Sequence, residues 1–216
     1  MPDYRTLSLD GWVVRLRPPA LPLGEAAPAI VLLHGWTGDE TSMGVFTPAL
    51  PADHWLIAPR GPYVTQPRGF SWRQYQAGTW PTLEGFRPVM DDLWRLLSAT
   101  NFPQVDFARL TVMGFSQGAA LTYALALAFP QRVAAFIGLA GFLPDGAETL
   151  ADGLPLQGKR AYVAHGSQDE IVPIERARQA VQTLRQAGAE VDYCEHEAGH
   201  KLGTECYRGL RTFFAA

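Results

Sequence analysis

The chain has 216 residues, a formal net charge of −3 and 47% hydrophobic residues. A chain of this size and apolar content can bury one sizeable core, so we expect a single globular domain over residues 1–216. The slightly acidic balance and the lack of any Lys/Arg-rich run argue against a phosphate-binding surface, so nucleic acid is not an expected partner.

The N-terminus and the apolar runs bear on location. Residues 1–11, MPDYRTLSLDG, lack the basic and then apolar layout of a secretory signal. The apolar runs at 119–129 and 133–143 are shorter than the ~20 residues that span a bilayer. We therefore expect a cytoplasmic protein without stable membrane insertion, as a monomer or a homodimer.

The two cysteines, Cys194 and Cys206, are too few for a disulfide scaffold, and their spacing is not that of a metal site. We expect both to be free thiols, and we expect no metal site.

The first segment predicts a hairpin. Two short strand-like segments within residues 4–17 flank Asp10-Gly11, a dipeptide that favours a type I′ turn. An antiparallel hairpin at a sheet edge is therefore expected. The following residues, 17–28, read RPPALPLGEAAP, and so many prolines favour a surface connection without regular structure.

Apolar runs alternate with helical patterns along the rest of the chain. Runs typical of strands buried on both faces lie at 29–33, 55–58, 110–113, 134–140 and 159–165, and a last strand is expected around 190–194. Helices are expected at 41–50, 83–100, 119–130 and 174–188, and a closing helix follows residue 200. This alternation predicts an α/β fold with a mostly parallel central sheet, helices on both faces and no large cap domain.

The stretch Gly114-Phe115-Ser116-Gln117-Gly118 joins an apolar strand to an apolar helix. This is the G-x-S-x-G pattern of a nucleophile elbow in the context that such an elbow requires. Ser116 would point outward at the top of the sheet, and the glycines would let strand and helix approach closely. The backbone N–H of Gln117 would lie at the start of the helix, where it is free to stabilise an oxyanion.

A serine nucleophile needs a base and an acid, and both follow downstream. A histidine takes the serine proton, and a carboxylate on the far ring nitrogen orients that histidine. Asp169 and His200 follow expected strands in the order Ser, Asp, His. Glu170 and Asp145 are the alternative acids. The alternative bases are His54, His165 and His196.

Aromatic residues are expected to form the substrate cleft. The segment 63–85 is long and proline-spaced, and it is aromatic-rich, so we expect one wall of the cleft there, with Phe70, Trp72 and Trp80 in contact with substrate. Phe142 and Leu143 follow the strand at 134–140, at the edge where open α/β sheets bind ligands.

Several segments together resemble the carboxylesterase/phospholipase branch of the serine α/β hydrolases, which includes acyl-protein thioesterases and bacterial carboxylesterases. The resemblance covers nearly the whole chain and is carried by LLHGWTGDE, IAPRGPY, GFSWR, GFSQGAA, AHGSQDEIVP and EAGHKLG. It implies Ser116 as nucleophile, Asp169 as acid and His200 as base. The oxyanion hole would be the backbone N–H groups of Trp36 and Gln117.

The expected function is therefore a serine carboxylesterase that hydrolyses short- to medium-chain esters through an acyl-enzyme on Ser116, with no cofactor. The partner would be a small-molecule ester. Acyl-protein thioesterase or lysophospholipase activity is the alternative within the same chemistry. A non-catalytic ligand-binding module is the alternative from a different class, and a complete triad argues against it.

Overall fold

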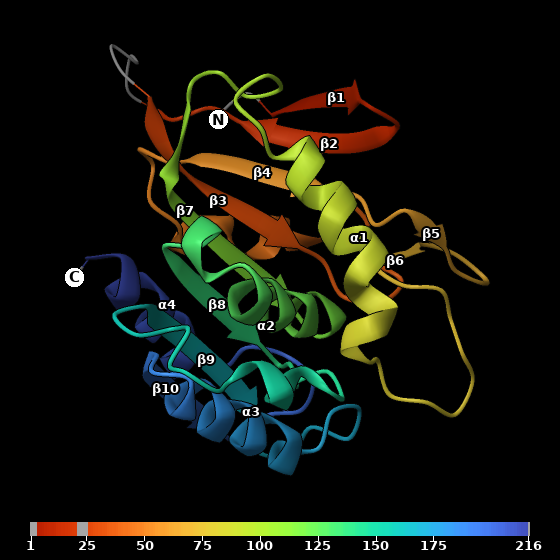
Figure 1. Ribbon diagram of the computed structural model, residues 1–216, viewed down its shortest axis with the longest axis vertical. Helices are drawn as coiled ribbons and strands as arrows, with labels where there is room; N and C mark the ends of the chain where they lie inside the picture. Colours follow the sequence, from red (N-terminus) through yellow and green to blue (C-terminus); the bar gives the residue numbers. More distant parts are fainter. Residues whose placement is uncertain (1–3, 21–25, 216) are drawn as a thin grey trace.

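The structure is a computed structural model that describes residues 4–20 and 26–215 (Figure 1). Within them, an eight-stranded sheet has the order β1-β2-β4-β3-β7-β8-β9-β10. The bounds are β1 Arg5–Leu9, β2 Trp12–Arg17, β3 Ala27–Leu33, β4 Trp55–Pro59, β7 Val105–Phe115, β8 Ala135–Leu139, β9 Arg160–Gly166 and β10 Glu190–His196. Only the β1–β2 and β2–β4 pairs are antiparallel. The proline-rich connection expected at 17–28 lies partly outside the described residues.

Helices cover both faces of this sheet, as the sequence predicts. They are α1 Leu83–Leu96, α2 Gln117–Ala128, α3 Ile174–Gln186 and α4 Thr204–Ala215, with 3₁₀ helices η1 Ser42–Ala49, η2 Pro130–Arg132 and η3 Ala147–Leu150. One core cluster joins α1, α2 and α3 to the face that Figure 1 presents, and the other joins η1 and α4 to the opposite face. The α/β-hydrolase fold is confirmed, and no cap domain is evident among the described residues.

Strand β3 explains why its apolar run is continuous. Ala29, Val31 and Leu33 pack on the side of α1 and α2, whereas Ile30 and Leu32 pack on the side of η1 and α4. Because alternate side chains point to opposite faces, a strand covered on both faces needs apolar residues at every position. The loop that follows β3, residues 34–41, therefore begins at a strand that is held firmly in the core.

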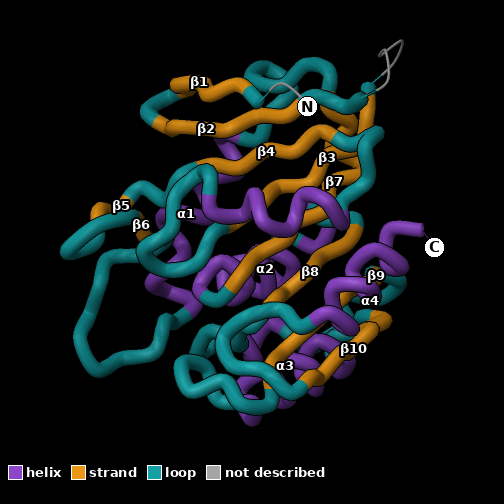
Figure 2. Tube along the Cα trace, turned by 180° about the vertical axis from the view of Figure 1, so that it is seen from behind, coloured by secondary structure: helices purple, strands orange, loops and turns teal. Residues whose placement is uncertain are grey.

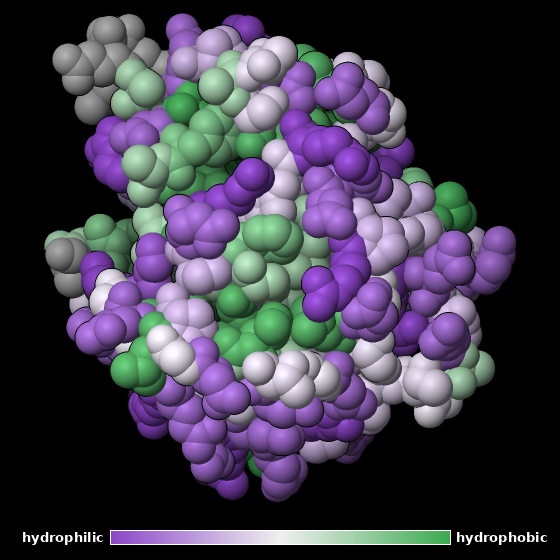
Figure 3. Space-filling view, in the orientation of Figure 1, coloured by the Kyte–Doolittle hydropathy of each residue, from purple (hydrophilic) through white to green (hydrophobic). Residues whose placement is uncertain are grey.

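Helix α1 is amphipathic and shorter than expected. The Thr82 side chain caps its start by accepting from the Gly85 N–H at 3.1 Å. The helix ends at Leu96 instead of continuing to Thr100, because Leu97 leaves the helical region with ψ 75°. Figure 3 shows polar side chains along the outer face of α1 and of α3, with apolar side chains between them over α2.

Two local predictions concern turns. Asp10 and Gly11 both have positive φ, 50° and 83°, and they join paired residues Leu9 and Trp12. This is the conformation that a type I′ hairpin needs, and the expected hairpin is confirmed. The helix expected at 41–50 is the 3₁₀ helix η1, which contains Pro48, a residue without an N–H to continue an α-helical ladder.

The cysteines are not free thiols, contrary to the expectation. Cys194 in β10 and Cys206 in α4 form a disulfide, with Cα atoms 5.7 Å apart. The pairing arises because α4 folds back against β10, which brings together two residues that are 12 apart in sequence. No helix among the described residues is long and apolar enough to cross a bilayer.

A second, two-stranded sheet lies before α1. It is formed by β5 Tyr63–Val64 and β6 Phe70–Ser71. The connection from β6 to α1 then leaves the body of the molecule as an extended loop (Figure 2). The small sheet and this connection together form the aromatic-rich segment 63–85. A bridge between Gly38 and Phe70 joins this segment to the loop after β3.

Candidate active site

Ser116 lies between β7 and α2 in a backbone conformation that non-glycine residues rarely adopt. Its φ is 54° and its ψ is −116°. A Cβ at Gly114 would collide with the Gly118 carbonyl, and a Cβ at Gly118 would collide with the Leu33 carbonyl. Gly114 therefore lets β7 approach the start of α2, and Gly118 lets α2 approach the end of β3. This is the strained elbow that the sequence predicts.

The loop after β3 lies against this elbow. A Cβ on Gly35 would be 3.4 Å from the Ser116 Cβ. The Thr37 N–H donates to the Phe70 carbonyl and the Gly38 N–H donates to the Gly35 carbonyl, each at 3.0 Å. Those two amides are therefore committed, whereas the Trp36 N–H between them and Gly35 stays the candidate for an oxyanion hole that the sequence predicts.

The side chain of His34 anchors the loop after β3. Its side chain is fully buried, its Nε2 accepts from the Gly61 N–H at 2.9 Å, and its Nδ1 lies 2.7 Å from the Gly35 carbonyl. These partners require a neutral ring protonated at Nδ1. Burial lowers the pKa of His34, which favours the same neutral state. The Trp72 indole N–H donates to the His34 carbonyl at 2.7 Å and completes the anchor.

Asp169 is held in the turn between β9 and α3. Its Oδ1 accepts from the backbone N–H groups of Ile171 and Val172, each at 2.9 Å. Its Oδ2 lies 2.7 Å from the Nδ1 of His200, and the carboxylate is fully buried. One oxygen thus fixes the carboxylate, and the other faces the histidine.

His200 lies on the loop between β10 and α4. This loop is joined to the turn of the acid by backbone hydrogen bonds from Ser167 to His196, at 2.8 Å, and from Gln168 to Ala198, at 3.0 Å. Gly166 permits the contact, because a Cβ there would collide with the carbonyls of Ala198 and Gly199. The His200 side chain remains 16% exposed.

His165 is packed behind the acid. Its Nε2 lies 2.8 Å from the Val172 carbonyl, to which it donates, and 3.5 Å from the Asp169 Oδ2. Its ring is fully buried, and burial lowers its pKa, so it stays neutral. It supports the turn that carries Asp169 without placing a second positive charge beside His200.

The other alternative acids and bases have partners elsewhere. Asp145 pairs with Arg176 at 2.7 Å, and Glu170 is exposed. His196 accepts from the Gly203 N–H at 2.7 Å, and His54 pairs with Asp53 at 2.8 Å. Among the expected acids and bases, Asp169 and His200 make the close contact, at 2.7 Å, whereas the buried His165 lies 3.5 Å from the same carboxylate oxygen.

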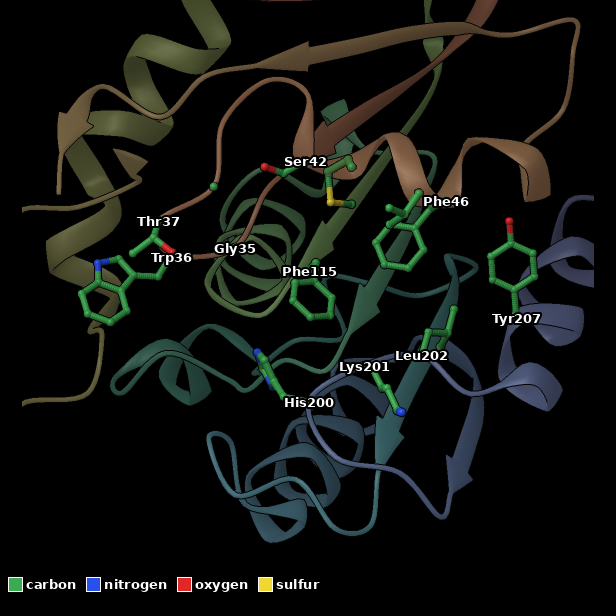
Figure 4. A pocket seen from close by; sticks show the side chains of 13 residues that line it. Gly35, Trp36, Thr37, Ser42, Phe46, Phe115, His200, Lys201, Leu202 and Tyr207 are labelled. Carbon is green, nitrogen blue, oxygen red and sulfur yellow. The ribbon is translucent and has the colours of Figure 1, made fainter. Parts of the chain in front are cut away.

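Two cavities meet at this site. The larger cavity has a volume of about 560 Å³. Its lining includes Trp36, Met43, Val45, Phe46, Phe115, His200, Leu202 and Tyr207. Figure 4 shows Phe115 between His200 and Phe46, in agreement with ring centroid distances of 5.0 Å and 6.0 Å.

The smaller cavity has a volume of about 160 Å³ and lies on the side of the aromatic-rich segment. Its lining includes Trp36, Arg73, Tyr75, Trp80, Ser116, Gln117, Phe142 and Ile171. Trp36 lines both cavities and stacks on Tyr75, with ring centroids 5.6 Å apart. The stacked pair therefore lies where the two cavities meet.

The residues expected to contact substrate separate into two groups. Trp80 and Phe142 line the smaller cavity and meet edge to face at 4.9 Å. Phe70, Trp72 and Leu143 line neither cavity. Phe70 lies under the Arg60 guanidinium at 4.6 Å, and Trp72 and Leu143 are buried in the core. Sequence position alone did not distinguish residues that line a cavity from residues that pack behind it.

Sequence reasoning missed the side-chain role of Gln117. Its Oε1 accepts from the Trp72 N–H at 2.9 Å and from the Ser71 hydroxyl at 3.1 Å, which ties the aromatic-rich segment to the elbow. Sequence reasoning also did not predict that apolar side chains of η1 line the larger cavity, together with Phe115, the residue before the nucleophile. The apolar residues of the 41–50 segment were the available signal, but they are equally suited to a core.

A phospholipase/carboxylesterase family model matches residues 21–216. Acyl-protein thioesterase 1 of Eremothecium gossypii is 32% identical over 96 residues, which are 42% of this chain and 39% of that protein. The matched segment thus spans well under half of the thioesterase.

Solved structures match over nearly the whole chain. A carboxylesterase from Mesorhizobium loti is 25% identical with a TM-score of 0.81, and the match covers 99% of each chain. The Bacillus cereus carboxylesterase, with a TM-score of 0.82, is 19% identical over 95% of each chain and shows the likeness of the fold.

Proposed function

Since the chain belongs to the phospholipase/carboxylesterase family of serine hydrolases, we propose that it hydrolyses short- to medium-chain carboxylic esters through an acyl-enzyme on Ser116. The observation that carries the proposal is the hydrogen bond between Asp169 and His200, at 2.7 Å, beside a serine held in an elbow. An elbow without an oriented base would leave the serine inert, because its hydroxyl pKa is far above neutrality.

In the first step, His200 takes the Ser116 proton as Oγ attacks the ester carbonyl carbon. The negative charge moves to the carbonyl oxygen, where the N–H groups of Trp36 and Gln117 stabilise it. A donor of this kind typically contributes ~3 kcal/mol to the transition state. Asp169 holds the His200 ring in the required tautomer and stabilises the imidazolium that forms.

In the second step, the tetrahedral intermediate collapses, and His200 returns the proton to the leaving alcohol. Water then enters, loses a proton to His200 and attacks the acyl carbonyl. The same two amides stabilise the second oxyanion, and protonation of Ser116 Oγ releases the carboxylic acid. Each proton that His200 accepts is returned within the same half-reaction.

The preference for short to medium acyl chains is supported by the size of the smaller cavity. It adjoins Ser116 and is limited by the edge-to-face pair of Trp80 and Phe142. No cap domain extends it among the described residues. A pocket of this kind is apolar with a few polar groups, which suits a compact acyl group.

The test is the hydrolysis of p-nitrophenyl esters of increasing acyl length, with Ser116→Ala as the matched control. We expect the native protein to prefer short or medium chains and the variant to lose activity while remaining folded. A variant as active as the native protein would exclude Ser116 as the nucleophile. Absence of both turnover and fluorophosphonate labelling in the folded native protein would favour a binding module instead.

Thioester hydrolysis is a second candidate, favoured by the similarity to acyl-protein thioesterase 1. The same acyl groups presented as oxygen esters and as thioesters separate the two. A carboxylesterase would show its higher kcat/KM on the oxygen esters, and a thioesterase would show the reverse order.

A further inference from the structure

Arg73 is a buried cation in the smaller cavity. Its exposed fraction is 8%, and it lines this cavity together with Ser116. The Ser71 hydroxyl contacts both the Arg73 carbonyl, at 2.8 Å, and the Gln117 side chain, at 3.1 Å. The segment that carries Arg73 is therefore fixed against the residue that follows the nucleophile.

Among the described residues, the charge of Arg73 has no counter-ion. Its Nη1 donates to the Gln74 carbonyl at 3.0 Å and its Nη2 to the Thr79 carbonyl at 3.2 Å, while Nε is buried without a partner. Across residues 4–20 and 26–215, no carboxylate forms an ion pair with it. Burying a charge that lacks a counter-ion is costly, so a protein retains such a group only where something compensates the charge.

Two other arginines, Arg60 and Arg176, are each paired with a carboxylate. Arg60 donates to both oxygens of Glu40, at 2.6 Å and 2.8 Å. Arg176 lies over the Trp80 ring at 4.5 Å, but its charge is balanced by Asp145 at 2.7 Å. Arg73 differs from both because its two partners are neutral carbonyls.

The surroundings of Arg73 add to its positive potential. Its aliphatic stem lies near Gly85 in the first turn of α1, which is the positive end of the helix dipole. Glu84 in the same turn is engaged with Arg87 at 2.8 Å. Burial lowers the pKa of Arg73, yet a guanidinium remains charged in proteins. A residue that lines the cavity of Ser116 therefore carries a positive charge at neutral pH.

We propose that Arg73 binds a carboxylate of the substrate, so that the preferred esters carry one negative charge close to the scissile bond. A guanidinium matches the planar carboxylate through two parallel hydrogen bonds. One positive charge balances a monoanion, whereas a phosphate dianion would leave an excess negative charge. The proposal deepens the esterase function and rests on it.

The test compares charged and neutral esters of matched shape. p-Nitrophenyl hydrogen adipate and its neutral methyl ester place the charge on the acyl side. 4-Acetoxybenzoate and its methyl ester place it on the alcohol side. The quantity measured is the ratio of kcat/KM for the charged ester to that for its neutral partner, with spontaneous hydrolysis subtracted.

Three variants are compared with the native protein. Arg73→Met keeps the apolar stem and removes the charge, and Arg73→Lys keeps the charge without the planar fork. Arg176→Met is the matched control, because it removes an arginine that lies over Trp80, a residue of the same cavity, and whose charge is already balanced by Asp145. Any loosening of the loop at 74–79 alters both esters of a pair, so the ratio removes that effect.

We expect the native protein to prefer the charged ester of at least one pair. Arg73→Met should lower that ratio at least about tenfold, Arg73→Lys should lower it less, and Arg176→Met should leave it unchanged. A ratio that Arg73→Met does not alter in either pair would overturn the proposal. Hydrolysis of the neutral esters tests the esterase function separately. A failure of the carboxylate-binding proposal can therefore be distinguished from a failure of the proposed esterase function.

Discussion

The disulfide between Cys194 and Cys206 closes the loop that carries His200, so its reduction should weaken both stability and activity. Cys194 lies in β10 and Cys206 lies in α4, and the segment between them contains the catalytic candidate. The bridge thus restrains the two ends of that segment. Without it, the ends are still held by the pairing of β10 with β9, by the packing of α4, and by the hydrogen bond from the Tyr162 hydroxyl to the Cys206 carbonyl at 2.6 Å.

The magnitude follows from the length of the closed loop. The two cysteines are 12 apart in sequence, so the bridge closes a short loop. The loss of loop entropy in the unfolded chain corresponds to about 3 kcal/mol for a loop of this size. For a chain of this length, about 2–4 °C of Tm accompanies each kcal/mol, which predicts that Tm falls by about 6–12 °C on reduction.

The assay is guanidinium unfolding followed by tryptophan fluorescence, with and without dithiothreitol, together with ester hydrolysis under both conditions. Reduction should lower the free energy of unfolding by about 3 kcal/mol and should lower kcat more than KM. The double variant Cys194→Ala/Cys206→Ala is the control, because its stability should not respond to the reductant. Equal stability of the oxidised and reduced native protein would refute the reasoning.

Two further predictions concern the acid and the buried histidines. Asp169→Asn keeps an acceptor for the N–H groups of Ile171 and Val172 but removes the charge that faces His200. We therefore expect kcat to fall by about 10³–10⁴-fold, while Tm changes little. An unchanged kcat would exclude Asp169 as the acid. The pKa values of His34 and His165 are lowered in the folded state, so the unfolded chain binds more protons than the folded chain below about pH 6.5. The free energy of unfolding should therefore decrease as the pH falls below this value, by at most about 1.4 kcal/mol per pH unit for each ring. Denaturation between pH 7.5 and 5.5 should therefore show a smaller pH dependence in His165→Gln than in the native protein, and equal slopes would contradict the assignment.

The sequence predicted the fold and the elbow because the constraints on both are local. Strands buried on two faces need unbroken apolar runs, and a sharp strand-to-helix turn needs the glycines on either side of Ser116. The positions of Asp169 and His200 also follow from topology, since each comes after a parallel strand. The carboxyl ends of such strands meet at one edge of the sheet.

Side-chain direction across the loops could not be predicted in this way. Phe70 and Trp80 lie in the same aromatic-rich segment, yet Phe70 packs under Arg60 while Trp80 lines a cavity. The difference is set by the pairing of Gly38 with Phe70, a long-range contact that no local pattern contains. The disulfide escaped prediction for the same reason, because it depends on how α4 packs against β10.

The same limit explains why Arg73 was not recognised as a candidate binding residue. In the sequence it is one arginine in a polar, aromatic-rich stretch, where an exposed, solvated side chain is the ordinary expectation. Its significance arises only from three facts of the structure: the side chain is buried, it lines the cavity of Ser116, and no carboxylate of the described residues pairs with it. A buried charge without a counter-ion costs folding free energy. Its position at the nucleophile is therefore best explained by a ligand that supplies the missing anion.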